Sequence, residues 1–262
     1  VSEKIDGETW FLHCDGIATT LLSPTGRAIT GVPLTDEANA LLDGWTWLLA
    51  GELYAVQSNT NEDRQPYERP RVFDLHAALG GGADARTDRL RFAAFDILDN
   101  EGVDAQRDSY AARMERLQRL LAGGSLLHCA SFETVDEPAE VRALFERTVT
   151  HGSAEGLVVH SRDGRAFKVK KEITIDAAVV GYAESEEGVS ELLLALITAD
   201  GPETFQLIGR VRTGWSHREK QDLRSRLEPT VCESSYRGVT DHGTLYRWVQ
   251  PELVVEIKCN DL

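Results

Sequence analysis

The spacing of hydrophobic residues changes near Glu155, and this change constrains the fold of the chain more than any other feature. Before it, alternating apolar and polar segments are mixed with segments of helical spacing. After it, short alternating segments follow one another, with one helical segment among them. Five or six short strands with one helix, after about residue 173, suit a small barrel such as an OB-fold. We therefore predict an α+β protein of two domains, divided between residues 172 and 173.

The first 172 residues carry signals for antiparallel strands and amphipathic helices. Turn signals such as Asp15-Gly16 separate strands within residues 1–31, and a helix with a threonine cap is predicted at 34–42. The polar stretch 57–71 is predicted to be a loop. Further strands are predicted at 45–56 and 89–98, and further helices at 109–121 and 138–149.

The remaining residues read as short strands connected by turns. One of these turns is predicted at Asp163-Gly164. The strand segments are 155–161, 165–173, 176–185, 190–199, 205–214 and 253–259, and a helix is predicted at 216–227.

The composition is acidic, with 28 Lys and Arg against 43 Asp and Glu, a net charge of -15. This lowers the expectation of tight nonspecific binding to nucleic acid, although a local basic groove is compatible with it. No apolar run approaches the length of a membrane span, so membrane insertion is excluded at this stage. The four cysteines form no CxxC pair and the seven histidines show no metal-ligand spacing, which favours reduced thiols in an intracellular, cytoplasmic or nucleoid-associated protein.

Four short clusters carry side chains suited to phosphate chemistry. A lysine two residues before an aspartate on a strand places both side chains on one face, and a nucleophilic lysine must lose its proton before it attacks. Two lysines that alternate on a strand suit a phosphate group, and glutamates at strand ends could bind a divalent cation or a ribose. The clusters are Lys4-Ile5-Asp6-Gly7, Gly51-Glu52-Leu53, the segment from Glu155 to Val159, and Lys168-Val169-Lys170.

Each cluster alone has an ordinary structural interpretation. A lone KxDG sequence is usually a surface turn, and two alternating lysines usually form a solvated strand face. The order of all four clusters on strand-like segments, with the sequence FAAFDIL between the second and the third, favours a functional interpretation.

These motifs resemble those of the covalent nucleotidyltransferase superfamily, which includes ATP-dependent DNA ligases, RNA ligases and mRNA capping enzymes. KIDG resembles the motif that carries the adenylated lysine, LAGELY and AAFDIL resemble the ribose and base motifs, and AEGLVV and FKVK resemble the metal and phosphate motifs. The later sequences IDAAVVGY, GRVRTGWS and RWVQPELVVEIK resemble the OB-domain of DNA ligases.

The resemblance implies a nucleotidyltransferase (adenylation) domain at 1–172 followed by an OB-fold domain at 173–262. It makes Lys4 the catalytic nucleophile and Glu155 and Glu52 the metal ligands, and it implies that Phe95 stacks on the base. The predicted nucleotide-binding residues are Ser2, Glu3, Ile5, Asp6, Arg27, Glu52, Phe95, Lys168 and Lys170.

The chain departs from the family pattern at several points, one of which is the segment HSRDGRA, shorter than the linker common in cellular DNA ligases. Thr9 and Pro24 stand where the family often has arginines, and Arg27 is a candidate substitute. The basic element that closes the OB-domain is missing before the chain ends at Leu262. We therefore expect the OB-fold domain to be truncated, and the chain to be the core of a longer protein with additional flanking domains.

The resemblance implies an ATP-dependent polynucleotide ligase that seals 5'-phosphate/3'-hydroxyl nicks, DNA being preferred, through a lysyl-AMP intermediate. The expected cofactors are ATP and Mg²⁺ (or Mn²⁺), and the expected partner of a monomer is nicked duplex nucleic acid, with no membrane. An RNA ligase or a capping guanylyltransferase is the alternative within the superfamily. A non-catalytic nucleic-acid-binding module is the alternative from another class.

Overall fold

A computed structural model describes residues 1–42, 44–57, 69–80, 85–152, 154–161, 165–198, 204–235 and 237–259. These residues form two compact units, Val1–Lys171 and Glu172–Leu262, and each unit is described by itself. Both units combine sheets with helices, which confirms the predicted α+β class. No helix in the described part of the chain is long and apolar enough to cross a membrane.

The first unit is built around a seven-stranded sheet. Its strand order is β4-β3-β2-β5-β6-β7, and β8 pairs in parallel with β6. The pairing aligns Leu12, Leu49 and Ile97 across the sheet, so one face is continuously apolar. The strands are β2 (Glu8–Asp15), β3 (Thr19–Leu22), β4 (Ala28–Ile29), β5 (Thr46–Ala55), β6 (Leu90–Asn100), β7 (Val103–Asp104) and β8 (Leu127–Cys129).

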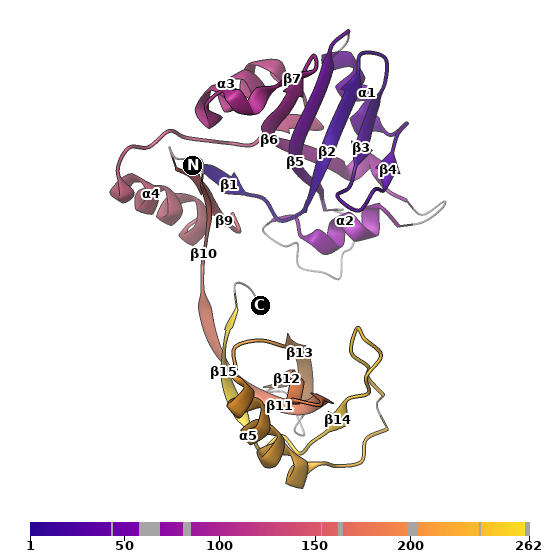
Figure 1. Cartoon of the computed structure of the whole chain (residues 1–262), viewed down its shortest axis with the longest axis vertical. Coiled ribbons are helices and arrows are strands. Elements are labelled where there is room, and N and C mark those ends of the chain that lie inside the picture. Colours follow the sequence, from indigo (N-terminus) through magenta and orange to yellow (C-terminus); the bar gives the residue numbers. More distant parts are fainter. Residues whose placement is uncertain are drawn as a thin grey trace. The chain divides into compact units, whose positions relative to one another are not determined.

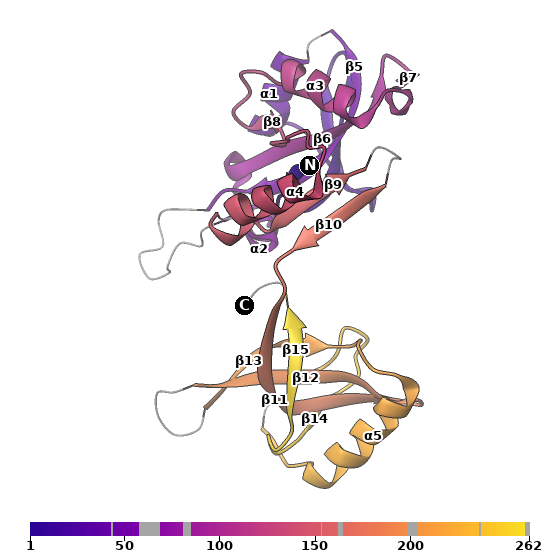
Figure 2. The same cartoon turned by 90° about the vertical axis from the view of Figure 1, so that its left-hand side faces the viewer.

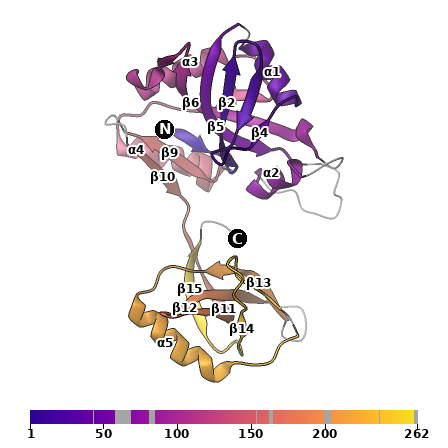
Figure 3. The same ribbon diagram turned by 45° about the vertical axis from the view of Figure 1, so that its right-hand side comes forward.

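Three helices pack on the apolar face of this sheet: α1 (Pro33–Leu41), α2 (Val72–Ala78) and α3 (Tyr110–Leu120). They contribute buried residues such as Leu34, Leu75 and Met114 to a single core cluster with the strands. Figure 1 shows α1 and α3 near the sheet, and Figure 3 shows α2 near β4. The opposite face of the sheet, which carries Glu52, is therefore free of these helices.

A smaller sheet has the order β1-β9-β10, all antiparallel. The strands are β1 (Ser2–Lys4), β9 (Gly156–His160) and β10 (Ala166–Lys170). Helix α4 (Pro138–Phe145) and the π-helical turn Glu146–Thr150 bury Leu144 and Val149 against Leu157 on one face of this sheet. Lys4 lies on the other face of the small sheet.

The second unit has a five-stranded antiparallel sheet with the order β13-β12-β11-β14, and β15 pairs with β11. Figure 2 shows helix α5 (His217–Leu227) beside the strands of this unit. The helix contributes Leu227 to the core of the sheet. The arrangement is OB-like, as predicted. The strands are β11 (Ile173–Ser185), β12 (Gly188–Thr198), β13 (Thr204–Val211), β14 (Arg247–Trp248) and β15 (Val254–Cys259).

The structure corrects several details of the sequence predictions. Thr35 is not the cap of α1, because the helix begins at Pro33, and the Thr35 hydroxyl bonds back to Val32. Helix α2 and strand β8 were not predicted. Most of the predicted loop 57–71, and the predicted turn Asp163-Gly164, lie outside the described residues.

Candidate functional site

The small sheet brings two lysines to one rung. Lys4 on β1 and Lys170 on β10 both pair with Gly156, the first residue of the central strand β9. Residues on the same rung of neighbouring strands point to the same side of a sheet. Lys4 and Lys170 therefore lie on one face, with only a glycine between them.

Both ammonium groups contact one carboxylate. The Lys4 ammonium donates a short hydrogen bond to Glu155 Oε2, and Lys170 Nζ lies 2.5 Å from Glu155 Oε1. The Glu155 side chain is only 10% exposed. Burial alone would raise the pKa of Glu155, but the hydrogen bonds from Lys170 and Lys4 outweigh it and hold this pKa below its ordinary value. Glu155 is thus ionised at neutral pH and binds both lysines.

Gly156 is required for this convergence. A Cβ atom at position 156 would lie 2.4 Å from the Val169 carbonyl oxygen and 3.2 Å from Lys170 Cγ. The first distance is far below van der Waals contact, and the second would push the Lys170 side chain aside. The glycine therefore lets β10 approach β9 closely enough for Lys170 to reach Glu155.

Glu52 on β5 faces the lysines from the large sheet. Its carboxylate accepts hydrogen bonds from Thr9 Oγ1, at 3.3 Å, and from the Gly7 amide. Burial raises the pKa of Glu52, and the nearby charges of Lys4 and Lys168 oppose that rise. Lys4 and Lys168 are therefore both close enough to Glu52 to act on its charge.

Gly7 closes the turn between the two sheets. A Cβ atom at position 7 would lie 2.3 Å from the Leu53 carbonyl oxygen. Gly7 allows its backbone to approach β5 closely. Gly7 therefore fixes the strand that carries Lys4 relative to the strand that carries Glu52.

Phe95 lies at a β-bulge on the open face of the large sheet. Ala50 pairs with Asp96 and Gly51 pairs with Ala94, so Phe95 is the extra residue between two regular pairs. Its side chain is partly exposed. Bulges turn side chains away from the regular alternation of a strand, and this position leaves the Phe95 ring available for stacking on a base.

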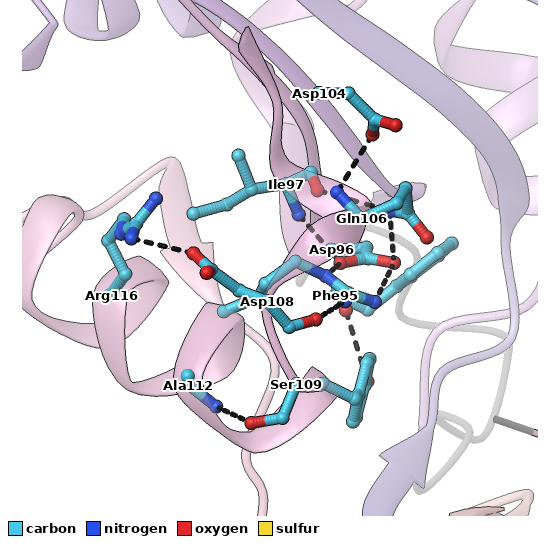
Figure 4. A network of polar contacts seen from close by, with 11 residues as sticks. Phe95, Asp96, Ile97, Asp104, Gln106, Asp108, Ser109, Ala112 and Arg116 are labelled. Atoms are coloured by element: carbon cyan, nitrogen blue, oxygen red, sulfur yellow. Dashed lines mark hydrogen bonds and ion pairs between the residues drawn. The ribbon is translucent and has the colours of Figure 1, made fainter. Parts of the chain in front are cut away.

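A network of hydrogen bonds around Asp96 stabilises the bulge (Figure 4). Asp96 accepts hydrogen bonds from Arg113 Nε at 2.6 Å and from Arg113 Nη2 at 3.1 Å, a bidentate ion pair in which Arg113 is buried. Gln106 Nε2 donates to Asp96 at 3.3 Å. The residue after Phe95 is therefore held by two side chains from outside the strand.

Tyr110 connects this bulge to the lysine-bearing sheet. Its hydroxyl donates to the Phe95 carbonyl oxygen at 3.0 Å and accepts a hydrogen bond from the Ser2 hydroxyl. Its ring stacks on His160 of β9, with centroids 3.6 Å apart and planes at 11°. Burial raises the pKa of Tyr110, so the phenol stays protonated and keeps donating. Sequence reasoning had placed this residue only at the start of an amphipathic helix.

The remaining predicted residues divide into a near and a distant group. Ser2 and Lys168 lie on the same face of the small sheet as Lys4. Ser2 is buried, and Lys168 is exposed. Glu3 points to the other face of β1. The Ile5 carbonyl oxygen lies 3.4 Å from Lys4 Nζ. Arg27 donates to the Leu79 carbonyl oxygen beyond α2, and the structure shows it interacting there rather than with Lys4.

Arg71 is a second residue that the sequence did not indicate. Arg71 Nη1 lies 4.0 Å from Asp6 Oδ2, which places an arginine beside the aspartate of the lysine motif. It occupies the N-cap position of α2, the helix that was not predicted. A helix assignment at 72–78 is the signal that would have pointed to it.

The geometry also limits how a metal ion could bind. The described residues contain no group of three or more His, Cys, Asp or Glu side chains that could hold one. Mg²⁺ commonly uses one or two carboxylates together with substrate phosphates. Glu155 and Glu52, both near Lys4, fit that mode, with the phosphates supplied by a nucleotide.

Comparison with known proteins identifies the family. A family model described as "ATP dependent DNA ligase domain" matches residues 1–172, more than half of the chain. The chain belongs to the ATP-dependent DNA ligase family. A second model, described as "ATP dependent DNA ligase C terminal region", matches residues 185–262. Both the adenylation-type first unit and the OB-like second unit are therefore typical of these enzymes.

Individual relatives agree with the family model. The chain is 25% identical over 284 residues to a DNA ligase of Hyperthermus butylicus, covering 98% of this chain and 45% of that protein. It is 30% identical over 276 residues to the multifunctional non-homologous end joining protein LigD of Mycolicibacterium smegmatis, covering 98% and 33%. The chain thus spans less than half the length of these curated relatives.

A solved structure described as mycobacterial DNA ligase D complexed with ATP and MES shares the fold. The TM-score is 0.51 at 24% identity, and the match covers 99% of this chain and 82% of that one.

Proposed function

We propose that this chain is the catalytic core that seals 5'-phosphate/3'-hydroxyl nicks in duplex DNA through a lysyl-AMP intermediate, with Lys4 as the nucleophile. The observation that carries the proposal is the convergence of Lys4 and Lys170 on Glu155, with Glu52 facing them from the other sheet. Membership of the ATP-dependent DNA ligase family supports ATP as the nucleotide and DNA as the polynucleotide.

In the first step the deprotonated Lys4 amine attacks the α-phosphorus of ATP. A phosphorus–nitrogen bond forms, the phosphorus–oxygen bond to the leaving group breaks, and pyrophosphate departs. The chain supplies positioning and charge, as in other phosphoryl transfers. Lys168 and Lys170, two residues apart on β10, present ammonium groups on the face that carries Lys4.

The nucleoside would lie between the two sheets of the first unit. In this proposal Phe95 stacks on the base and Glu52 accepts a hydrogen bond from a ribose hydroxyl, which the bulge at Phe95 and the nearby lysines support. Tyr110 connects β6, which carries Phe95, to β1 and β9 of the lysine-bearing sheet through Ser2 and His160. We propose these residues, with Ile5 and Asp6 around Lys4, as the nucleotide site, and leave out Glu3, whose side chain lies on the other face of β1.

A divalent cation, Mg²⁺ or Mn²⁺, would be held by Glu155 and Glu52 together with phosphate oxygens. When bound, it would neutralise charge on the phosphates during transfer. Binding of nucleotide and cation must loosen the ion pairs of Glu155 with Lys4 and Lys170. We infer that these ion pairs keep both lysines near their working positions before a nucleotide binds.

The test is formation of the covalent adduct. The chain is incubated with ATP labelled at the α-phosphate and Mg²⁺, denatured, and analysed for label on protein by gel and by mass spectrometry at Lys4. We expect one AMP on Lys4, and none on Lys4→Ala. An adduct of normal yield in Lys4→Ala would reject Lys4 as the nucleophile, and label from GTP but not ATP would favour the capping enzyme alternative.

A second assay addresses the polynucleotide. Pre-adenylated nicked duplexes with DNA or RNA on either side of the nick are offered without ATP, so that sealing reports only the last step. We expect joining of DNA strands. Faster joining of RNA strands would favour an RNA ligase, and adduct formation without joining of any substrate would contradict the sealing function.

A further inference from the structure

Two arginines of the second unit share an exposed aspartate. Arg210 Nη1 lies 2.9 Å from Asp241 Oδ1, and Arg212 Nη2 lies 2.5 Å from Asp241 Oδ2. Each carboxylate oxygen therefore takes a hydrogen bond from a different guanidinium. Two non-bridging oxygens of a phosphate group have a similar spacing and charge, and arginine binds them in the same manner.

A second, buried carboxylate holds the two arginines from the other side. Glu191 on β12 has a side chain only 5% exposed, and Arg212 Nε donates to its Oε2 at 2.6 Å. Arg210 Nη1 lies 3.6 Å from Glu191 Oε1, which also accepts the hydroxyl of Tyr246. The guanidinium positions are therefore fixed by a group that a ligand could not displace without opening the core.

Asp241 contrasts with Glu191 in its exposure. Its side chain is 56% exposed, and its loop has hydrogen bonds of its own. Thr240 Oγ1 accepts the His242 and Thr244 amides, and the Gly243 amide donates to the Thr240 carbonyl. The loop does not depend on Asp241 for its turn, and an exposed ion pair stabilises a protein only weakly because water solvates both charges when they separate. Asp241 can therefore leave the arginines at little cost.

We propose that Arg210 and Arg212 form a binding site for the phosphodiester backbone of a polynucleotide, and that Asp241 occupies this site until a backbone phosphate displaces it. The inference rests on the proposed function for the identity of the polynucleotide, duplex DNA. The arginines supply local positive charge in a chain whose net charge is -15, and Asp241 masks that charge in the free protein.

A polynucleotide fits this surface better than a small anion does. The two guanidinium side chains are 38% and 42% exposed, so the site is open rather than enclosed. The loop that carries Asp241 is flanked by Val239 and Leu245, which pair with each other and are 55% and 58% exposed. An open site flanked by exposed side chains suits an extended backbone, whose neighbouring phosphates and sugars can make further contacts.

The experiment compares Asp241→Asn with Asp222→Asn. Asp222 is an exposed residue of α5 with no ion-pair partner within the described part of the chain, so both variants remove one negative charge from the same unit. Binding of a fluorescent nicked DNA duplex with a 5'-phosphate is measured by anisotropy without ATP, over a series of salt concentrations. Thermal melting checks that both variants are folded.

We expect Asp241→Asn to bind the duplex about 3- to 10-fold more tightly than the wild type at low salt, with a steeper salt dependence. Each additional phosphate contact steepens the slope of log K against log salt by about 0.9. Asp222→Asn should change affinity less than about twofold, as expected for an effect of net charge alone. In an Asp241→Asn background, replacing Arg210 and Arg212 with Gln should remove the gain.

Three results would overturn the proposal. One is equal affinity of the Asp241→Asn and Asp222→Asn variants, including the absence of binding by both, and another is a gain that survives the loss of both arginines. The third is faster Lys4 adenylation by Asp241→Asn without a change in duplex affinity, since it would assign the arginines to the phosphates of ATP. Absence of the lysyl-AMP adduct from the wild type would reject the proposed function alone, because duplex binding is measured without ATP.

Discussion

Glu155 in the first unit and Glu191 in the second are both carboxylates with low exposure that lie between two cationic side chains. Glu155 lies between two lysines, and the two ammonium groups share this single carboxylate. Glu191 lies between two arginines, which have a second carboxylate in Asp241. The first arrangement has more positive than negative charge within contact distance, and the second is balanced.

The difference indicates what each arrangement can do in the free protein. An excess of cations around Glu155 favours the arrival of an anion, and flexible lysines can follow it. The balanced arginines form a stable network until one carboxylate is removed or displaced. The same elements, a carboxylate between two cations, therefore give a site ready for a nucleotide in one unit and a masked site in the other.

The largest expected effect tests the excess charge in the first unit. Lys170→Ala should slow formation of the lysyl-AMP adduct by about 10²–10³, because removing one contact to charge that develops in the transition state commonly has this effect. Lys171→Ala is the matched control, since Lys171 is the exposed neighbour just beyond β10. Rates are measured in single turnover at saturating ATP. Equal rates in the two variants would show that Lys170 only balances Glu155.

The balanced network in the second unit should matter for stability instead. Glu191→Gln leaves two guanidinium groups without their buried partner, and removing one member of a buried ion pair commonly costs about 3–5 kcal/mol. Because both arginines keep roughly 40% exposure, solvent compensates in part, and we expect a loss of about 2 kcal/mol in urea unfolding of the second unit. Glu186→Gln, in an exposed turn, should change stability by less than about 0.5 kcal/mol. If Glu191→Gln lowered the unfolding free energy no more than Glu186→Gln does, the arginine network would not stabilise the second unit, and the difference from Glu155 would disappear.

A smaller effect concerns the residues that surround the nucleotide without charge. Phe95→Ala should raise KM for ATP. The expected loss of binding free energy is about 1–3 kcal/mol, which is the contribution of stacking on a base. Tyr110→Phe keeps the ring on His160 but removes the hydrogen bond to Phe95. It should raise KM roughly fivefold, which corresponds to about 1 kcal/mol of binding free energy. If Tyr110 acts by positioning Phe95, the double variant should match Phe95→Ala alone.

The matched control for Tyr110→Phe is Tyr182→Phe, which removes a buried tyrosine hydroxyl from the second unit. It should leave KM for ATP unchanged. Additive effects of Phe95→Ala and Tyr110→Phe would mean that Tyr110 supports the fold without directing the Phe95 ring.

The smallest effect concerns Glu37, a carboxylate that is held by amide and hydroxyl hydrogen bonds and has no lysine or arginine ion pair among the described residues. Glu37 on α1 accepts the amides of Ser125, Leu126 and Leu127 and the Ser125 hydroxyl. Burial alone would raise the pKa of Glu37, but these hydrogen bonds lower it below its ordinary value. The stabilisation is therefore present above the unfolded pKa of about 4.3 and is lost as the pH falls through the lower folded value.

Glu37→Gln should accordingly cost about 1 kcal/mol in unfolding free energy at pH 7 and less at pH 3. Unlike the effect of Glu191→Gln, this difference should be insensitive to salt, because no ion pair is involved. Asp36→Asn, an exposed neighbour on the same helix, is the control. A cost that grows as the pH falls would contradict the assignment.

Local pattern predicted much of the fold and the elements that carry the candidate site. The α+β class, the OB-like second unit and the strands bearing Lys4, Glu52 and Lys170 follow from alternation and turn signals over a few residues. Alternation also predicted that Lys168 and Lys170 share a strand face, and β10 includes both. These features depend on residues close together in the sequence.

The features that the sequence did not reveal depend on long-range contacts. Arg71 reaches Asp6 only because α2 packs on the large sheet, and this helix is too short to show clear periodicity. Nothing in the local sequence distinguishes Tyr110 from other helical residues. Its role depends on contacts with β1, β6 and β9, which come from distant parts of the sequence. Likewise, the sequence GRVRTGWS contains Arg212 but not the distant Asp241 that neutralises it.

The strand that carries Lys4 has only three residues, a length at which a strand would ordinarily fray. Both ends of the strand are held in place. Before the strand, the Glu133 amide donates a hydrogen bond to the Val1 carbonyl oxygen, and after it Gly7 packs closely on Leu53. The Glu3 amide also donates to the Ser131 carbonyl. Amide protons of β1 should therefore exchange with solvent as slowly as those of the central strands. The entropy of ordering the proposed nucleophile is thus lost when the protein folds, before any nucleotide arrives.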